Sequence, residues 1–277
     1  MNTEIMLMWA AVTAYTLSAI LFVFGTVFKS DKALNAGLWV ALTGLAPHAV
    51  AIGIRWVAVG HGPYLGFYEV VSSYAFASVV ALGLIAWMRP KLKIVGVLLM
   101  PVAVLMLGGA MLAPKSPLEI TAKLASYWLT IHVAFAKLSY MSFIAAFALA
   151  LLFLWRERRG EFKEDSMLSR LPSQAAVDDL SFRFIGVGFI FLSIMIVAGA
   201  IWANESWGRY WGWDPIETWS LISWILYAGY LHVRLTLGWQ GRKAAWYAAA
   251  ALPIVLFTLI GVPVLYQSIH GAYLQGY

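Results

Sequence analysis

Residues 184–219 read FIGVGFIFLSIMIVAGAIWANESWGRYWGWDPIETW, a long apolar run that leads into a connection crowded with aromatic side chains. From Trp207 to Trp219 this connection, the tryptophan loop, holds four tryptophans, one tyrosine, two glycines and three charged side chains. Indole rings offer large flat faces with one N–H donor each, which suits a membrane interface or a planar ligand. The glycines let the backbone approach such a ligand closely. We expect a ligand site here, and an interfacial aromatic belt is the alternative interpretation.

The composition indicates that lipid is the solvent for most of the chain. Hydrophobic residues make up 62% and charged residues 12%, and the mean hydropathy is +0.79. A soluble domain could not bury that much apolar surface. The net charge of +6 does not indicate nucleic acid, because the charges lie in short runs between apolar stretches. The absence of cysteine excludes thiolate catalysis, thiolate metal ligation and disulfides.

Eight apolar segments have the length of roughly 20 residues that a helix needs to cross a bilayer. They are residues 5–28, 34–58, 66–88, 92–113, 126–155, 182–203, 215–237 and 244–266. The sequence therefore predicts an all-α polytopic membrane protein with the tryptophan loop between its sixth and seventh helices. We expect residues 1–125, with the first four helices, to form one part and residues 126–277 the functional part.

Lysine and arginine in the short connections predict the orientation in the membrane. One set of connections carries most of these cations: Lys29, Lys32, Arg89, Lys91, Lys93, Arg156, Arg158, Arg159, Lys163, Arg170, Arg183, Arg234, Arg242 and Lys243. The other set carries only Arg55, Lys115, Lys123 and Arg209. The first set is expected to face the cytoplasm, which places both chain termini and the tryptophan loop on the outer side.

A helix start is predicted at the end of the tryptophan loop. Asp214 at the N-cap, Pro215 at the first helical position and Glu217 at the third match a capping box. This structural role accounts for both carboxylates without any ligand. It does not account for the three tryptophans before Asp214 or for the glycines between them.

Two of the five histidines are expected near the tryptophan loop. His132 lies in the outer part of the fifth segment, and His270 lies just beyond the eighth. Ionisable groups in membrane segments usually have a function, and two imidazoles can hold a haem iron from opposite sides. Interfacial hydrogen bonding is the alternative for each histidine taken alone.

The remaining histidines are expected elsewhere. His232 follows Pro215 by 17 residues, about 26 Å along a helix at 1.5 Å per residue, so it cannot reach the outer loop. It is either an interfacial residue or a ligand of a second, inner site. His48 and His61 are interpreted as structural. For Lys137, within the fifth segment, we expect either that its side chain extends toward the membrane surface (snorkelling) or that its ammonium group pairs with another polar group.

These motifs resemble the CcsA/ResC family of cytochrome c biogenesis proteins, in the haem-handling superfamily named after its tryptophan-rich "WWD" domain. The resemblance is closest over residues 177–273. It is most specific at WANESWGRYWGWDP, residues 202–215, and continues in ETW at 217–219 and YLHVR at 230–234. WLTIHV, residues 128–133, is similar to the family's outer histidine segment. The chain departs from the family at His270, where His-Gly-Ala-Tyr replaces the common His-Ser-Tyr.

The resemblance implies a component of the system II cytochrome c synthase. Such a protein carries haem b (iron protoporphyrin IX) across the membrane as its substrate and presents it for thioether attachment to Cys-x-x-Cys-His of apocytochrome c. The implied partners are a ResB/CcsB-type membrane protein, apocytochrome c and the lipid bilayer, with no nucleic acid. The implied location is the inner (cytoplasmic) membrane, or the thylakoid membrane in a plastid. Residues 126–277 would form the haem-handling region, with the WWD loop at 202–219.

The resemblance also implies a role for each residue of the site. His132 and His270 would be outer axial ligands of the iron, and His232 would supply one ligand of an inner site. The loop would contribute Trp207, Gly208, Trp211 and Trp213 to the haem platform, Arg209 to a propionate, and Asp214 and Glu217 to its own anchoring. No acid–base pair is identified, so attachment would rest on proximity. The alternatives are a haem exporter or haem-binding protein without attachment activity, and a scaffold that binds no haem.

Overall fold

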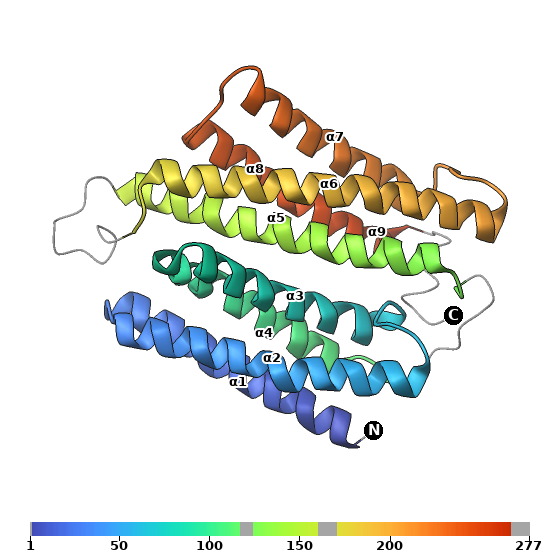
Figure 1. The fold of residues 1–277 in the computed structure, drawn as a ribbon, viewed down its shortest axis with the longest axis horizontal. Helices are drawn as coiled ribbons and strands as arrows, with labels where there is room; N and C mark the ends of the chain where they lie inside the picture. Colours follow the sequence, from blue (N-terminus) through green and yellow to red (C-terminus); the bar gives the residue numbers. More distant parts are fainter. Residues whose placement is uncertain (1, 117–123, 160–170, 267–277) are drawn as a thin grey trace. The chain divides into compact units, whose positions relative to one another are not determined.

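The computed structural model describes residues 2–116, 124–159 and 171–266, and all regular structure in these ranges is helical (Figure 1). The all-α prediction is therefore confirmed. The chain divides into two compact units. The first is Met1–Pro117 with Arg159–Pro172, and the second is Leu118–Arg158 with Ser173–Tyr277.

The first unit contains four helices joined by short connections. They are α1 (Asn2–Val27), α2 (Asp31–Val59), α3 (Gly66–Met88) and α4 (Gly96–Leu112), with the 3₁₀ helix η1 (Pro90–Val95) before α4. In this unit α1 packs against α2 and α4, and α3 packs against α2 and α4. Helix α2 begins where the Ser30 hydroxyl accepts the Ala33 N–H, and it ends at Gly60 in the left-handed conformation. These caps are set within a few residues of sequence.

Small residues allow α1 and α2 to lie close together. The Ser18 hydroxyl on α1 donates to the Gly37 carbonyl on α2 over 2.7 Å. A Cβ atom added at Gly44 would lie 2.9 Å from Ala14 Cβ and 2.9 Å from the Tyr15 ring. Close backbone approach of this kind is the usual basis of helix association within a membrane.

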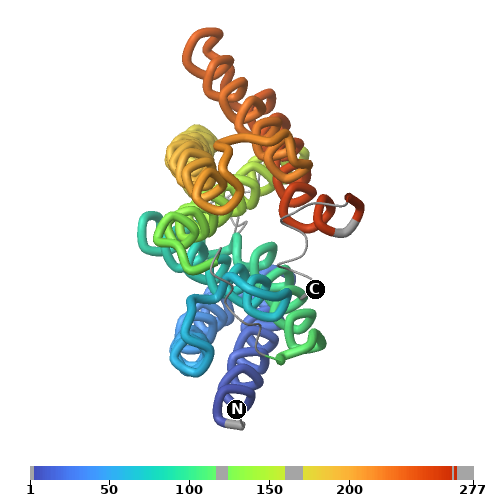
Figure 2. The backbone as a smooth tube through the Cα atoms, turned by 90° about the vertical axis from the view of Figure 1, so that its right-hand side faces the viewer, coloured from blue at the N-terminus to red at the C-terminus, as the bar shows by residue number. Residues whose placement is uncertain are grey.

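The second unit is built on α5 (Tyr127–Arg159), α6 (Gln174–Trp207), α7 (Pro215–Leu235) and α8 (Arg242–Leu256). Helices α5 and α6 run side by side (Figure 1), joined where the Ser139 hydroxyl donates to the Gly188 carbonyl over 2.9 Å. Helix α7, orange in Figure 2, packs against α6, which is yellow there, and against α8, which is a darker orange-red.

Seven of the described helical segments are long and apolar enough to cross a membrane, and they correspond to seven of the eight predicted spans. The remaining predicted span, residues 215–237, corresponds to α7. This segment forms a helix as predicted, but its composition is less apolar than that of the other seven. Its passage through the membrane stays a prediction, as does the side on which each end lies.

The last predicted span, residues 244–266, is not one continuous α-helix. After α8 the chain forms a π-helical turn, η3 (Phe257–Gly261), and then the short α9 (Val262–Leu265). Pro253 and Pro263 lack the N–H groups that would continue regular α-helical bonding. The predicted span is nevertheless present, because Arg242–Gly261 is long and apolar enough to cross a membrane, while its apolar run carries no information on the local bonding pattern.

Candidate functional site

The tryptophan loop is held at both ends by helix caps. Gly208 ends α6 in the left-handed conformation with φ 71°, and its N–H donates to the Asn204 carbonyl over 2.9 Å. At the start of α7 the Asp214 carboxylate accepts the Ile216 N–H, and the Glu217 carboxylate accepts the Asp214 N–H over 3.1 Å. The predicted capping box is therefore confirmed.

Glu217 also bonds to the loop itself. The same Oε2 atom accepts the Gly212 N–H over 2.8 Å, so one carboxylate oxygen holds the backbone on both sides of Trp213. Trp213 adopts φ 57°, a left-handed conformation that costs a non-glycine residue about 1–2 kcal/mol. Strained backbone of this kind persists only where its surroundings hold it, and it is concentrated at functional sites. The Trp213 side chain is 69% exposed.

A half-open pocket with about 390 Å³ of empty space, open solvent included, lies between α5, α6, the tryptophan loop and the start of α7. We call it the His132 pocket. The residues that matter for its chemistry are His132 from α5, Met195 and Gly199 from α6, Tyr210 and Trp211 from the loop, and Glu217 from α7. Elements distant in sequence therefore converge here around one imidazole and several aromatic rings.

The His132 ring is held by α6. Its Nδ1 atom lies 2.8 Å from the Met195 carbonyl oxygen. Its ring centroid lies 6.4 Å from that of Trp202, which is 2% exposed and contacts Trp207 with centroids 4.9 Å apart. His132 thus joins the pocket to a buried aromatic pair at the end of α6.

The structure brings only part of the predicted set into the pocket itself. His132, Trp211 and Glu217 line it. Trp213 lies edge-on to Trp211, with ring centroids 5.8 Å apart. The Arg209 guanidinium folds over Gly212, where an added Cβ atom would lie 2.6 Å from it.

His232 lies at the far end of α7, as its spacing from Pro215 predicts. It is exposed, and its carbonyl accepts the Thr236 hydroxyl. That end of the helix is anchored by Arg234, whose guanidinium lies 2.7 Å from the Asp178 carboxylate with both side chains under 10% exposed. His232 is therefore separate from the His132 pocket. His270 lies outside the described residues.

A protein-family model described as "Cytochrome C assembly protein" matches residues 64–270. The cytochrome c biogenesis protein CcsA of Gloeothece citriformis (strain PCC 7424) is 33% identical over 306 residues, covering 92% of this chain and 93% of that protein. This chain belongs to the CcsA family of cytochrome c assembly proteins. Its function is therefore in cytochrome c biogenesis.

Other CcsA proteins are similar to this chain, and one solved structure shares its fold. CcsA of Microcystis aeruginosa is 34% identical, covering 80% of this chain and 83% of that protein. CcsA of Chlamydomonas reinhardtii is 39% identical, covering 79% and 63%. The solved structure of the cytochrome c haem lyase CcmF matches 99% of this chain with a TM-score of 0.67 and 19% identity. That match spans 48% of the CcmF chain and shows a shared fold.

Three residues of α6 that lie against the His132 ring were not among the predicted site residues. Met195, Gly199 and Trp202 follow one another at spacings of four and three, so they share one face of α6. The spacing was visible in the sequence as a helical stripe. Which of the α6 faces meets α5 depends on tertiary packing, and a stripe alone does not distinguish a site from a core.

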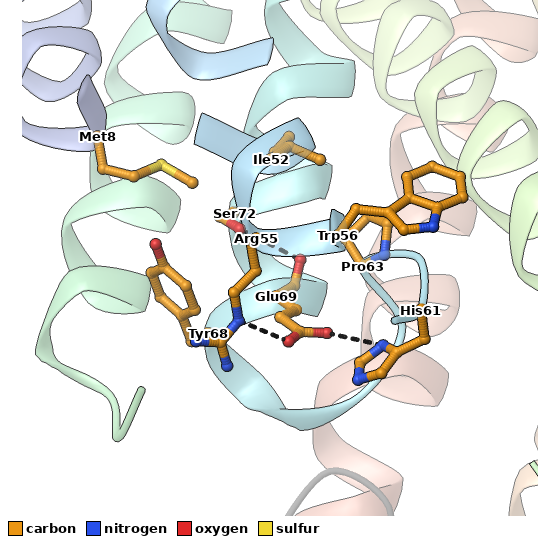
Figure 3. Close-up of a pocket in the computed structure, with 9 residues that line it drawn as sticks. All are labelled: Met8, Ile52, Arg55, Trp56, His61, Pro63, Tyr68, Glu69 and Ser72. Carbon is orange, nitrogen blue, oxygen red and sulfur yellow. Dashed lines mark hydrogen bonds and ion pairs between the residues drawn. The ribbon is translucent and has the colours of Figure 1, made fainter. Parts of the chain in front are cut away.

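A second polar cluster, the Arg55 cluster, lies in the N-terminal unit (Figure 3). The Arg55 Nε atom donates to Glu69 over 2.9 Å, and a second guanidinium N–H donates to the Lys115 carbonyl over 2.8 Å. The other Glu69 oxygen lies 3.6 Å from His61 Nδ1, and the Tyr68 hydroxyl donates to Glu4 over 2.8 Å. These contacts tie α1, α2 and α3 together at one end of the unit.

The two histidines that were interpreted as structural are both buried in the N-terminal unit. His61 Nδ1 lies 2.7 Å from the Gly62 carbonyl, and His48 Nδ1 lies 3.1 Å from the Tyr15 hydroxyl. Beside Arg55 and His61 lies a smaller space, with about 230 Å³ of empty volume by the measure used for the His132 pocket, open solvent included. Lys137 is half-buried on α5.

Proposed function

We propose that this chain carries haem b across the membrane as its substrate and presents it at the His132 pocket for attachment to apocytochrome c. The partner would be a ResB/CcsB-type membrane protein, and the pocket would face the outer side. The observation that carries the proposal is the convergence of His132 with the tryptophan loop in one half-open pocket. An imidazole beside aromatic faces is a suitable environment for an iron porphyrin.

Each residue of the pocket would have a distinct task. His132 would bind the iron on one side and His270 on the other. The rings of Trp207, Trp211 and Trp213 would contact the macrocycle, and Arg209 would pair with a propionate. The loop carboxylates would act as anchors, because Glu217 already accepts two backbone N–H groups.

Attachment itself would need no acid or base from this chain. Thioethers form between the haem vinyl groups and the two thiols of Cys-x-x-Cys-His, and both thiols come from apocytochrome c because this chain has no cysteine. Holding haem in a fixed position beside those thiols lowers the barrier by removing the entropy of encounter. The chain would thus contribute position and iron ligation.

A second, inner haem site would use His232. This residue is exposed at the end of α7 that lies about 26 Å from Pro215, so its imidazole is accessible to another protein. The ResB/CcsB-type partner would supply the other axial ligand. Haem would enter the complex at His232 and leave it at His132.

The test is the absorption spectrum of the complex purified in detergent with its ResB/CcsB-type partner, together with cytochrome c maturation in cells. His132→Ala is expected to alter or abolish the bis-imidazole spectrum and to stop maturation. Thr130→Ala, on the exposed side of the same helical turn, is the matched control and should change neither. An unchanged haem spectrum in His132→Ala would refute the role of His132.

The same preparation distinguishes the two alternatives. A haem exporter without attachment activity would load haem, yet cytochrome c maturation would proceed in cells that lack this protein. A membrane scaffold would purify without haem under all conditions. For the inner site, His232→Ala should also reduce loading of the outer site, and normal outer loading would contradict an entry role.

A further inference from the structure

The surface of α6 beneath His132 is shaped to hold an imidazole ring. A Cβ atom added at Gly199 would lie 2.6 Å from His132 Nδ1, 2.9 Å from Cε1 and 3.6 Å from Cγ. The first two distances are shorter than non-bonded carbon contacts allow, so the ring occupies the space that any side chain at position 199 would need. Only glycine permits this close approach of the ring to the helix backbone.

The same stretch of α6 also selects the protonation of the ring. The Met195 carbonyl, one turn before Gly199, lies 2.8 Å from His132 Nδ1. A carbonyl oxygen can only accept, so the bond requires the proton on Nδ1 and leaves the lone pair of the neutral imidazole on Nε2. A hydrogen bond of this type orients a metal-binding histidine and raises its basicity.

We propose that Gly199 and the Met195 carbonyl form an imidazole seat, which fixes both the orientation and the tautomer of His132 so that Nε2 is the atom offered to haem iron. Gly199 acts through His132 and is a positioning residue. This inference rests on the proposed function only for the identity of the ligand. The seat itself is a property of the protein without haem.

Two other glycines of α6 provide controls that separate seating from ordinary packing. A Cβ atom at Gly188 would lie 2.6 Å from the Phe143 ring, so this glycine also faces α5 but contacts no histidine. A Cβ atom at Gly186 would meet nothing within 4 Å among the residues that the structure describes. The three variants therefore separate three effects within one helix. Gly199→Ala alters the seat, Gly188→Ala alters helix packing without touching the seat, and Gly186→Ala alters neither.

The first experiment needs no haem. Melting temperatures of the detergent-purified complex with its ResB/CcsB-type partner would be measured for Gly199→Ala, His132→Ala and the double variant. Because the added methyl group competes with the ring, its destabilisation should disappear once the ring is removed. An equal loss in both backgrounds would overturn the seat. If Gly199→Ala does not fold, recovery of the folded complex in the double variant supports the seat, and failure to recover overturns it.

The second experiment uses the haem-loaded complex. Gly199→Ala should lose the low-spin bis-imidazole spectrum and shift the reduction potential, and added imidazole should restore the low-spin spectrum. Gly188→Ala should lower the melting temperature yet keep the wild-type spectrum, and Gly186→Ala should change neither. A wild-type spectrum and potential in Gly199→Ala would overturn the seat as a positioning device.

The two experiments fail in distinguishable ways. If the proposed function is wrong, His132→Ala will leave the haem spectrum unchanged while the thermal coupling between Gly199 and His132 persists. If the seat is wrong, His132→Ala will change the spectrum while Gly199→Ala behaves as Gly188→Ala does.

Discussion

Breaking the buried ion pair between Arg55 and Glu69 should be one of the most destabilising single changes in the N-terminal unit. Their side chains are 9% and 3% exposed, and Arg55 Nε lies 2.9 Å from Glu69 Oε1. Glu69→Gln keeps the shape of the side chain and removes its charge. Among the residues that the structure describes, the buried Arg55 guanidinium would then donate to the Lys115 carbonyl and to a neutral amide.

Removing one partner of a buried pair costs about 3–5 kcal/mol, because the remaining charge is left without compensation. We expect Glu69→Gln at the lower end of this range, since an amide oxygen can still accept from Arg55. The assay is unfolding of the detergent-purified protein, followed by tryptophan fluorescence. A double variant, Arg55→Met with Glu69→Gln, should recover part of the loss because it also removes the uncompensated charge.

The control is an ion pair in solvent. Arg183 and Asp179 are 66% and 50% exposed with a separation of 2.8 Å, and such pairs contribute about 0–1 kcal/mol. Asp179→Asn should therefore cost little. The reasoning fails if Glu69→Gln costs no more than Asp179→Asn, or if the double variant is less stable than Glu69→Gln.

Three further predictions concern local geometry. Asp214→Ala should cost about 1 kcal/mol of unfolding free energy through loss of the N-cap, while Asp214→Asn keeps most of it; equal melting temperatures would contradict this. Trp213→Gly should be more stable than Trp213→Ala by about 1 kcal/mol because φ is 57° at this position, and the reverse order in denaturant unfolding would refute the strain. Gly44→Ala should cost about 1–3 kcal/mol of unfolding free energy by overpacking against Tyr15. Gly53→Ala is the control and should be neutral or stabilising, because its Cβ would meet no described atom within 4 Å. Similar unfolding midpoints for the two variants would argue against close packing at Gly44.

Local features were predictable from the sequence because their causes lie within a few residues of one another. The predicted span 66–88 coincides with α3, since hydropathy and length decide membrane-length helices. The capping box at Asp214 and Glu217 follows from side chains that bond to backbone groups three residues away or fewer. The position of His232 at the far end of α7 follows from the rise of a helix alone.

Tertiary structure alone decided which helix faces meet. Helix α6 is apolar around most of its surface, so periodicity does not show which of its faces packs on α5. The contact of His132 with Gly199 and the Met195 carbonyl therefore came only from the folded unit, as did the pairing of Arg55 with Glu69. Caps and spans arise from short-range hydrogen bonding and hydropathy, whereas these contacts require side chains on different helices to fit one another in space.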